Sequence, residues 1–156
     1  MTTNQIGLSS TQVAQVIDKL NALLSSYHVF YTNVRGYHWN VKGEHFFALH
    51  AQFEEIYTQL QTQIDEIAER ILTVGGTPLH AYSDFAINAS IDEHKNVFDG
   101  RECVSGVVTG LQALIEEQRT LAEIAENAGD QGTIDLIAGY TGEQEKMVWM
   151  YNAFLG

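Results

Sequence analysis

Apolar side chains recur every three or four residues along most of this chain, which is the period of an amphipathic α-helix. The first such stripe occupies residues 13–34 and continues four positions later at His38. It predicts one helix of about thirty residues, which a hydroxyl side chain within residues 9–11 can cap. Residues 40–44 are polar and contain a glycine, and they predict a turn.

A second stripe of the same period covers residues 46–71. The glycines at 75–76, with Pro78 just beyond, are a strong stop signal for this helix. Two helices of this length joined by a short turn must lie antiparallel. The turn is therefore expected to bring His38 and His50 close together.

The second half of the chain predicts two more long helices after an extended connection. Periodicity weakens over residues 77–100, and a connection of this length is unusual in a compact domain unless it carries structure of its own. Ser83-Asp84 can cap a short helix over residues 85–89. A third long helix follows Asp99 and stops at Gly129, and a fourth runs from about Gln131 to Phe154.

These elements predict an all-α fold, a four-helix bundle with a long crossover that carries a short helix between the second and third long helices. The expected order of directions is up-down-down-up. Gly106 and Gly110 lie four residues apart on one face and favour a close helix crossing. A single domain is expected over residues 1–156, with residues 1–9 as a short polar tail.

The chain is strongly acidic, since it contains 8 Lys and Arg against 20 Asp and Glu and has a net charge of −12. Such a surface repels phosphate backbones and attracts cations. The single Cys103 excludes an internal disulfide, suits a reducing compartment and is expected to be a packing residue. Because the sequence shows neither a signal peptide nor an apolar run of about 20 residues, we expect a cytoplasmic protein without a membrane partner.

Two histidines and two carboxylates form a candidate metal-ligand set that one chain cannot close. Fifteen residues of helix separate His50 from Asp65 by about 22 Å, and Asp65 and Glu69 face away from the core of their own helix. Either the carboxylates are an ordinary solvated pair, or a second copy completes the site. An antiparallel pairing of this helix with its copy, about a two-fold axis near residue 58, would bring each His50 level with the other chain's carboxylates. Mixed imidazole and carboxylate ligands suit Fe(II), Mn(II) or Zn(II).

The segment YHWNVKGEHFFALHAQFEEIY, followed by QIDEIAERI and GGTPL, resembles the Dps family, the DNA-binding proteins from starved cells or mini-ferritins. The resemblance covers roughly residues 10–156 and implies a ferritin-like fold. It also implies an intersubunit ferroxidase centre, in which one chain supplies two histidines and its dimer mate an aspartate and a glutamate. The catalytic and metal-binding residues would then be His38, His50, Asp65 and Glu69. The family forms hollow dodecamers that oxidise Fe(II), preferably with hydrogen peroxide, store Fe(III) mineral and limit oxidative damage; Zn(II) or other divalent cations would compete.

The resemblance implies further roles, each with a plainer alternative. Trp39 would lie beside the centre, or be a core aromatic residue. Glu54 and Glu55 would nucleate mineral, or form a solvated helix face. Asp130 and Asp135 would line the pores through which iron enters, or simply pair with the N-terminal dipole of the fourth long helix.

The terminal segments of this chain differ from those expected of a DNA-binding member of the family. Members that bind DNA commonly use a basic terminal tail, whereas residues 1–18 contain no Lys or Arg and no basic extension follows the last helix. We therefore expect no appreciable DNA binding at physiological salt. The alternatives that remain are a nucleoid-compacting protein and a non-catalytic helical-bundle adaptor. The other histidines are not assigned as ligands: His28, His45, His80 and His94.

Overall fold

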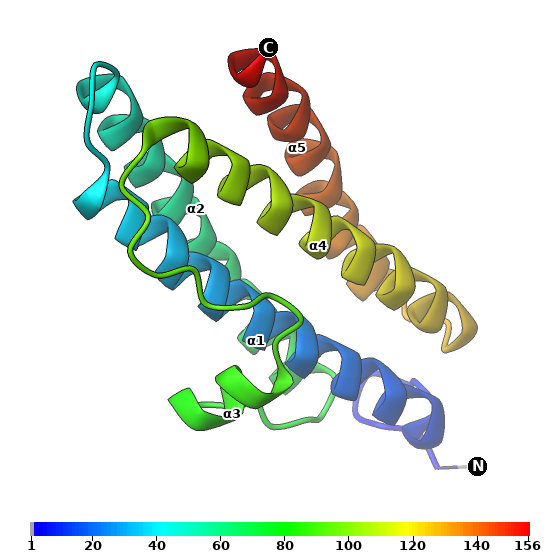
Figure 1. The fold of residues 1–156 in the computed structure, drawn as a ribbon. Coiled ribbons are helices and arrows are strands. Elements are labelled where there is room, and N and C mark those ends of the chain that lie inside the picture. Colours follow the sequence, from blue (N-terminus) through cyan, green and yellow to red (C-terminus); the bar gives the residue numbers. More distant parts are fainter. Residues whose placement is uncertain (1) are drawn as a thin grey trace.

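The computed structural model describes residues 2–156 and contains five helices within them (Figure 1). These are α1 (Ser10–Asn40), α2 (Phe46–Thr73), α3 (Tyr82–Asn88), α4 (Gly100–Asn127) and α5 (Gln131–Leu155). The β-type pairings within this part of the chain are two isolated bridges, Thr3 with Ser9 and Lys42 with Asp99. The predicted all-α fold is confirmed. None of the described helices combines the length and the apolar character needed to cross a bilayer.

The long helices form two antiparallel pairs, α1 with α2 and α4 with α5 (Figure 1). The start of α4 lies beside the loop between α1 and α2, where the backbone N–H of Lys42 donates to the carbonyl of Phe98 at 2.7 Å. Consequently α2 and α4 run in the same direction, and a long crossover must return the chain along the bundle before α4 begins. The predicted up-down-down-up order is confirmed.

The ends of the long helices follow the sequence signals. The hydroxyl of Ser9 accepts from the N–H of Gln12 at 3.4 Å and caps α1. Asp99 caps α4 through a carboxylate oxygen 3.1 Å from the N–H of Glu102. Beyond the C-termini of α2 and α4, Gly75 has a φ of 97° and Gly129 a φ of 68°. This left-handed conformation is accessible to glycine without a steric penalty, so it ends both helices.

The prediction for the short helix of the crossover is wrong in its start. The helix α3 begins at Tyr82, so Ser83 and Asp84 lie inside its first turn and do not cap it. The carboxylate of Asp84 is favoured there because it lies near the positive end of the helix dipole. Phe85 is buried and its ring stacks on His28 of α1 at 3.8 Å, which fixes the crossover against the bundle.

The N-terminal residues, for which a short polar tail was expected, fold back within residues 2–9 onto the end of the bundle. The side-chain oxygen of Asn4 accepts from the N–H groups of Ile6 and Leu8 at 3.1 and 2.9 Å. Its amide nitrogen donates to the carbonyl of Val74, just after α2, at 3.0 Å. One asparagine therefore ties this segment to the second helix.

The middle of the bundle contains a closed network of neutral polar side chains. The hydroxyl of Tyr27 donates to Gln118 at 2.5 Å and accepts from Gln144 at 2.8 Å. The amide of Gln118 donates to the oxygen of Gln144 at 2.9 Å. Because all three residues are buried and partnered, the network links α1, α4 and α5 without leaving an unsatisfied polar group.

The close approach of α1 and α4 depends on the two glycines identified in the sequence. A Cβ atom at Gly110 would overlap the ring of Phe30, and one at Gly106 would overlap the hydroxyl of Tyr37. Both aromatic residues belong to α1 and are buried. The predicted close crossing is confirmed, and it lets Tyr37 reach the crossover, where its hydroxyl lies 2.5 Å from Nδ1 of His94.

Candidate metal centre

The loop between α1 and α2 brings His38 and His50 into direct contact. His38 lies in the last turn of α1 and His50 in the first turns of α2. Their rings stack with centroids 3.8 Å apart and planes 11° from parallel. His38 is buried and His50 half-buried. The predicted proximity of the two histidines is confirmed.

Each histidine is fixed by the backbone of the other. Nδ1 of His38 lies 2.6 Å from the carbonyl oxygen of His50, and Nδ1 of His50 lies 2.7 Å from the carbonyl oxygen of His38. A carbonyl oxygen only accepts, so each Nδ1 must carry the proton. In the tautomer with the proton on Nδ1 only, each ring keeps a lone pair on Nε2, which is how metal-binding imidazoles are oriented in proteins.

Two aromatic rings from α2 hold the histidine pair in place. Phe46 stacks on His50 with centroids 4.9 Å apart, and Tyr57 packs edge-on against His38 at 5.3 Å. Sequence reasoning did not single out either residue. The available signal was spacing, since Phe46 precedes His50 by one helical turn and Tyr57 follows it by two.

The two carboxylates of the candidate site are exposed on α2, one turn apart. A hydrogen bond to Asp65 raises the pKa of the Glu69 carboxyl above its ordinary value, and the charge of Asp65 acts in the same direction. Of the ion pairs formed within residues 2–156, none includes Asp65 or Glu69. Within the part of the chain that the structure describes, this carboxylate pair therefore has no cationic partner.

The histidine pair and the carboxylate pair do not meet within one chain. Among the residues that the structure describes, no group of three or more His, Cys, Asp or Glu side chains lies close enough together to hold a metal ion. This agrees with the separation of about 22 Å along the helix. Each protomer thus presents two separate sets of candidate ligands, one with two imidazole nitrogens and one with carboxylate oxygens. Together they would supply ligands suited to Fe(II) or Zn(II).

Trp39 lies at the surface beside the histidine pair, with 63% of its area exposed. The alternative of a core aromatic is therefore wrong. The guanidinium of Arg35 lies 4.8 Å from the centroid of the Trp39 ring and 5.1 Å from that of Tyr31. Arg35 was missed by sequence reasoning, although it precedes His38 by three residues and shares its face of α1.

The residues proposed to nucleate mineral, Glu54 and Glu55, are both exposed on α2. They line a shallow hollow of about 410 Å³ together with Thr58, Gln59 and Thr62. The hydroxyl of Tyr57 donates to Glu54 at 3.4 Å. An exposed carboxylate hollow is compatible with both a nucleation surface and a solvated helix face, so the nucleation role stays a prediction.

The two aspartates of α5 have different environments. Asp130 is buried, caps α5 through the N–H of Thr133, and forms an ion pair with Arg70 of α2 at 2.6 Å. Its carboxylate oxygens have hydrogen-bond partners within the protomer, which agrees with the alternative of pairing with the N-terminal end of α5, and its pore role stays a prediction. Asp135 is exposed and accepts from the side chain of Gln131 at 2.8 Å. A pore role stays a prediction, and Asp135 is the aspartate free to fill it.

His28, His94 and Cys103 have contacts within the fold and lie outside the candidate site. Burial lowers the pKa of His28, which stacks on α3. Burial also raises the pKa of the Cys103 thiol to about 11, as expected for a packing residue. His45 and His80 are exposed, and His94 bonds to Tyr37 on the crossover.

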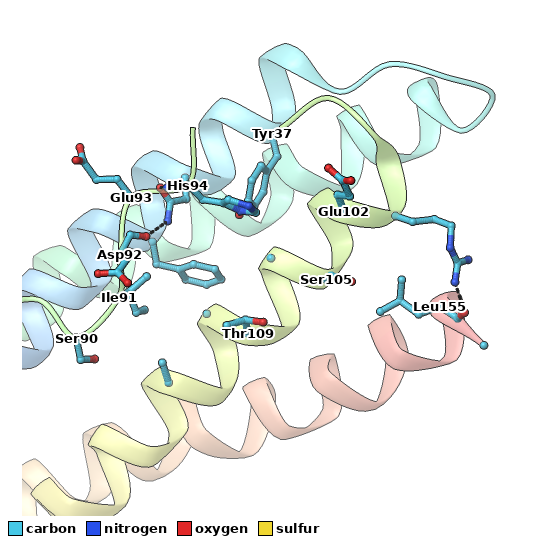
Figure 2. Close-up of a pocket in the computed structure, with 17 residues that line it drawn as sticks. Tyr37, Ser90, Ile91, Asp92, Glu93, His94, Glu102, Ser105, Thr109 and Leu155 are labelled. Carbon is cyan, nitrogen blue, oxygen red and sulfur yellow. Dashed lines mark hydrogen bonds between the residues drawn. The ribbon is translucent and has the colours of Figure 1, made fainter. Parts of the chain in front are cut away.

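A large hollow lies elsewhere, between the crossover and α4 (Figure 2). Its volume is about 840 Å³, and Figure 2 shows His94 and Tyr37 on one wall and Ser105 and Thr109 on the other. None of the candidate metal ligands lines it. The candidate chemistry therefore belongs to the surface around the histidine pair.

Comparisons with known proteins agree with the all-α fold and identify its family. A family model described as a ferritin-like domain matches residues 17–156. A DNA protection during starvation protein from Porphyromonas gingivalis is 43% identical over 148 residues, which cover 95% of this chain and 93% of the relative. The crystal structure of a Dps protein from Vibrio cholerae O1 is 51% identical with a TM-score of 0.98, covering 100% of this chain and 98% of its own. It is described as a member of a broad superfamily of ferritin-like diiron-carboxylate proteins.

A third relative adds a metal to the comparison. The Dps of Listeria innocua, in a crystal soaked with zinc, is 30% identical with a TM-score of 0.88, and the match covers 90% of this chain and 96% of that one. Family model, sequence relatives and solved structures thus agree over nearly the whole chain. This chain belongs to the ferritin-like family and, within it, to the Dps-type mini-ferritins.

Proposed function

We propose that this protein is a ferroxidase that oxidises Fe(II) with hydrogen peroxide and stores the ferric product inside a shell of twelve copies. The observation that carries the proposal is the pair of stacked histidines, each with Nε2 free and with Nδ1 bound to the other's backbone. Such a pair is prepared for a metal before the metal arrives. It supplies only half of a ligand set, and Asp65 and Glu69 form the other half.

A two-fold axis across α2 would join the half-sites. If α2 packs antiparallel on its copy near residue 58, His50 of one chain comes level with position 66 of the other, between Asp65 and Glu69 of the partner subunit. A two-fold interface is reciprocal, so each dimer would contain two identical sites. The exposed ring of Trp39 beside the histidine pair would be covered by such a contact.

The residues divide the work of oxidation by their chemistry. Neutral imidazoles from His38 and His50 bind Fe(II) without losing a proton. The carboxylates of Asp65 and Glu69 add negative charge, which stabilises Fe(III) more than Fe(II). The overall reaction, in which two Fe(II) and one hydrogen peroxide take up two protons and give two Fe(III) and two waters, consumes both reagents that generate hydroxyl radicals.

Charge supports the storage role. At −12 per chain, twelve chains would carry about −144, and a negative field of this size raises the local concentration of cations. We propose Asp135 as a residue of the pores through which iron enters, and Glu54 and Glu55 as the surface on which ferric mineral nucleates. Zn(II) would compete for the same ligands, since it accepts imidazole and carboxylate donors.

A second candidate function, DNA binding, is suggested by relatives named for DNA protection during starvation. The net charge of −12 opposes it, and the N-terminal residues fold back onto α2. We propose that protection here comes from removing Fe(II) and peroxide. A gel shift at about 0.15 M salt tests the DNA-binding alternative, because a protein with enough phosphate contacts would still retard DNA at that ionic strength, and we expect no retardation.

The intersubunit site can be tested by mixing two inactive chains. His38→Ala removes one half-site and Asp65→Ala the other, so each variant alone should lose rapid Fe(II) oxidation. Co-assembly should restore about a quarter of wild-type activity, because half of the random dimers are mixed and each mixed dimer holds one intact site.

Two controls make the mixing experiment decisive. Co-assembly of His38→Ala with His50→Ala should restore nothing, since both changes fall in the same half-site. His80→Ala, at an exposed histidine of the crossover, should behave as wild type. Wild-type kinetics in His38→Ala or Asp65→Ala would refute the site, and a monomer that leaves Fe(II) unoxidised would refute the function. Size-exclusion should give a particle of twelve times 17.4 kDa.

A further inference from the structure

One arginine at the histidine half-site has an unusual environment. The guanidinium of Arg35 is held between the rings of Tyr31 and Trp39, at 5.1 and 4.8 Å from their centroids. Cation–π contacts with two rings restrict the position of the group. Because Arg35 lies one helical turn before His38, this cation is displayed on the same face as the candidate metal ligands.

The hydrogen bonds of this guanidinium are almost all unmade. An arginine has five N–H donors, and within residues 2–156 Arg35 uses one, from Nη1 to the hydroxyl of Tyr31 at 3.3 Å. Its Nε is buried and has no partner in the described chain. Leaving a buried donor unpaired is unfavourable, so a contact that gives this group an acceptor is favoured.

The other arginines of the described chain all have oxygen partners that Arg35 lacks. Arg70 binds the carboxylate of Asp130, Arg119 that of Glu145, and Arg101 the backbone carbonyl of Leu155. Arg35 alone has neither a carboxylate nor a carbonyl. The carboxylates of Asp65 and Glu69 show the matching lack, since no ion pair within residues 2–156 includes them.

The register of the helices sets these groups opposite each other across the two-fold axis. Within one chain His38 lies level with His50, and Tyr31 lies level with Tyr57, as their ring contacts show. Arg35 is therefore level with position 53 of its own α2. About an axis near residue 58, position 53 faces position 63 of the other chain, about 3 Å along the axis from Asp65 of the partner subunit. Glu69 of the partner subunit lies about 9 Å away.

We propose that Arg35 pairs with Asp65 of the partner subunit when no metal is bound, and so occupies one side of the ferroxidase site. The inference rests on the two-fold assembly of the proposed function. An arginine suits this role because its planar fork binds a carboxylate with two parallel hydrogen bonds. One divalent cation then binds tightly, on the histidine side. A second ion has to displace the guanidinium.

The pairing is tested by titrating metal-free protein with Zn(II) in a calorimeter. Wild type should bind one ion tightly per site, with a clearly weaker second step. In Arg35→Met the second ion should bind more tightly by on the order of tenfold or more, since close charge pairs across interfaces have coupling energies of at least about 1.5 kcal/mol. Arg35→Lys should fall between the two. Arg119→Met removes the same charge from a distant exposed pair and should match wild type.

The result that overturns the pairing is a second binding step unchanged in Arg35→Met. A double-mutant cycle on the metal-free protein gives an independent readout. Arg35→Met and Asp65→Asn should each lower the thermal midpoint of unfolding, and the double variant should lower it little more than either single variant does. Additive losses would also overturn it. Failure of wild type to assemble or to bind Zn(II) would refute the proposed function instead, so the two failures are distinguishable.

Discussion

Replacing Asp130 should separate a structural role from a role in iron passage. The carboxylate of Asp130 is 1% exposed and accepts from the N–H and the hydroxyl of Thr133, at 3.1 and 2.6 Å. It also accepts from Nη2 of Arg70 at 2.6 Å. Asp130→Ala removes all of these bonds, whereas Asp130→Asn keeps a capping oxygen and removes the charge.

The expected loss of unfolding free energy in Asp130→Ala is the sum of two contributions, the lost N-cap and the broken ion pair. Loss of the N-cap costs about 1 kcal/mol. Breaking a buried ion pair costs about 3–5 kcal/mol when the abandoned charge stays buried. The side chain of Arg70 is 18% exposed, so its freed guanidinium can reach water, and we take about 2 kcal/mol for this part. Asp130→Ala should therefore lose about 3 kcal/mol of unfolding free energy, and Asp130→Asn about 2 kcal/mol.

The assay is urea unfolding of the metal-free protein at one fixed protomer concentration, because assembly makes the apparent stability concentration-dependent. The matched control is Glu145→Gln, which removes an ion pair with Arg119, a side chain that is 60% exposed. Loss of this surface ion pair should lower the unfolding free energy by less than about 1 kcal/mol. Iron uptake is measured on the same samples. If Asp130→Asn keeps wild-type stability and slows iron uptake, Asp130 acts as a pore ligand and the reasoning is refuted.

Three further predictions concern the interior. Burial raises the pKa of the Glu117 carboxyl, so the native state holds this proton more tightly than the unfolded state does. The contribution of Glu117 to stability therefore falls as the pH rises above the ordinary pKa of a glutamate. Glu117→Gln should be more stable than wild type by about 1 kcal/mol at pH 7, and by less at pH 4, in urea unfolding. Gly110→Ala should cost about 1–3 kcal/mol because its Cβ overlaps Phe30, whereas Gly139→Ala, which meets no atom within 4 Å, should be neutral or stabilising. Cys103, with a pKa of about 11, should be alkylated at pH 8 only after unfolding, as mass spectrometry would show.

The long helices could be predicted because their signals are local and repeated. Each stripe spans several turns, and the N-caps Ser9 and Asp99 directly precede the helices that they begin. The short helix of the crossover was harder, since one turn of apolar spacing does not define a start. Its position is set by packing of Phe85 on His28, a contact between residues far apart in sequence.

The candidate site divides in the same way. Residue types and helical spacing predicted that the two histidines lie close together and that the two carboxylates face away from the core, because both depend on one loop and one helix. The pairing of Arg70 with Asp130 could not be predicted, since it joins residues 60 apart. The hydrogen-bond partner of each histidine Nδ1 also could not be predicted, because it is the backbone carbonyl of the opposite histidine.

The division of the metal ligands between chains has a consequence for where iron is oxidised. The middle of one bundle contains the neutral network of Tyr27, Gln118 and Gln144, surrounded by an apolar core. The described residues of the protomer hold no group of ligands that could bind a metal ion. Under the proposed function a free chain is therefore inactive, and a site forms only when two chains meet. Oxidation is thereby confined to assembled protein, where the ferric product can be stored, and dissociation of the dimer should abolish activity even with every ligand intact.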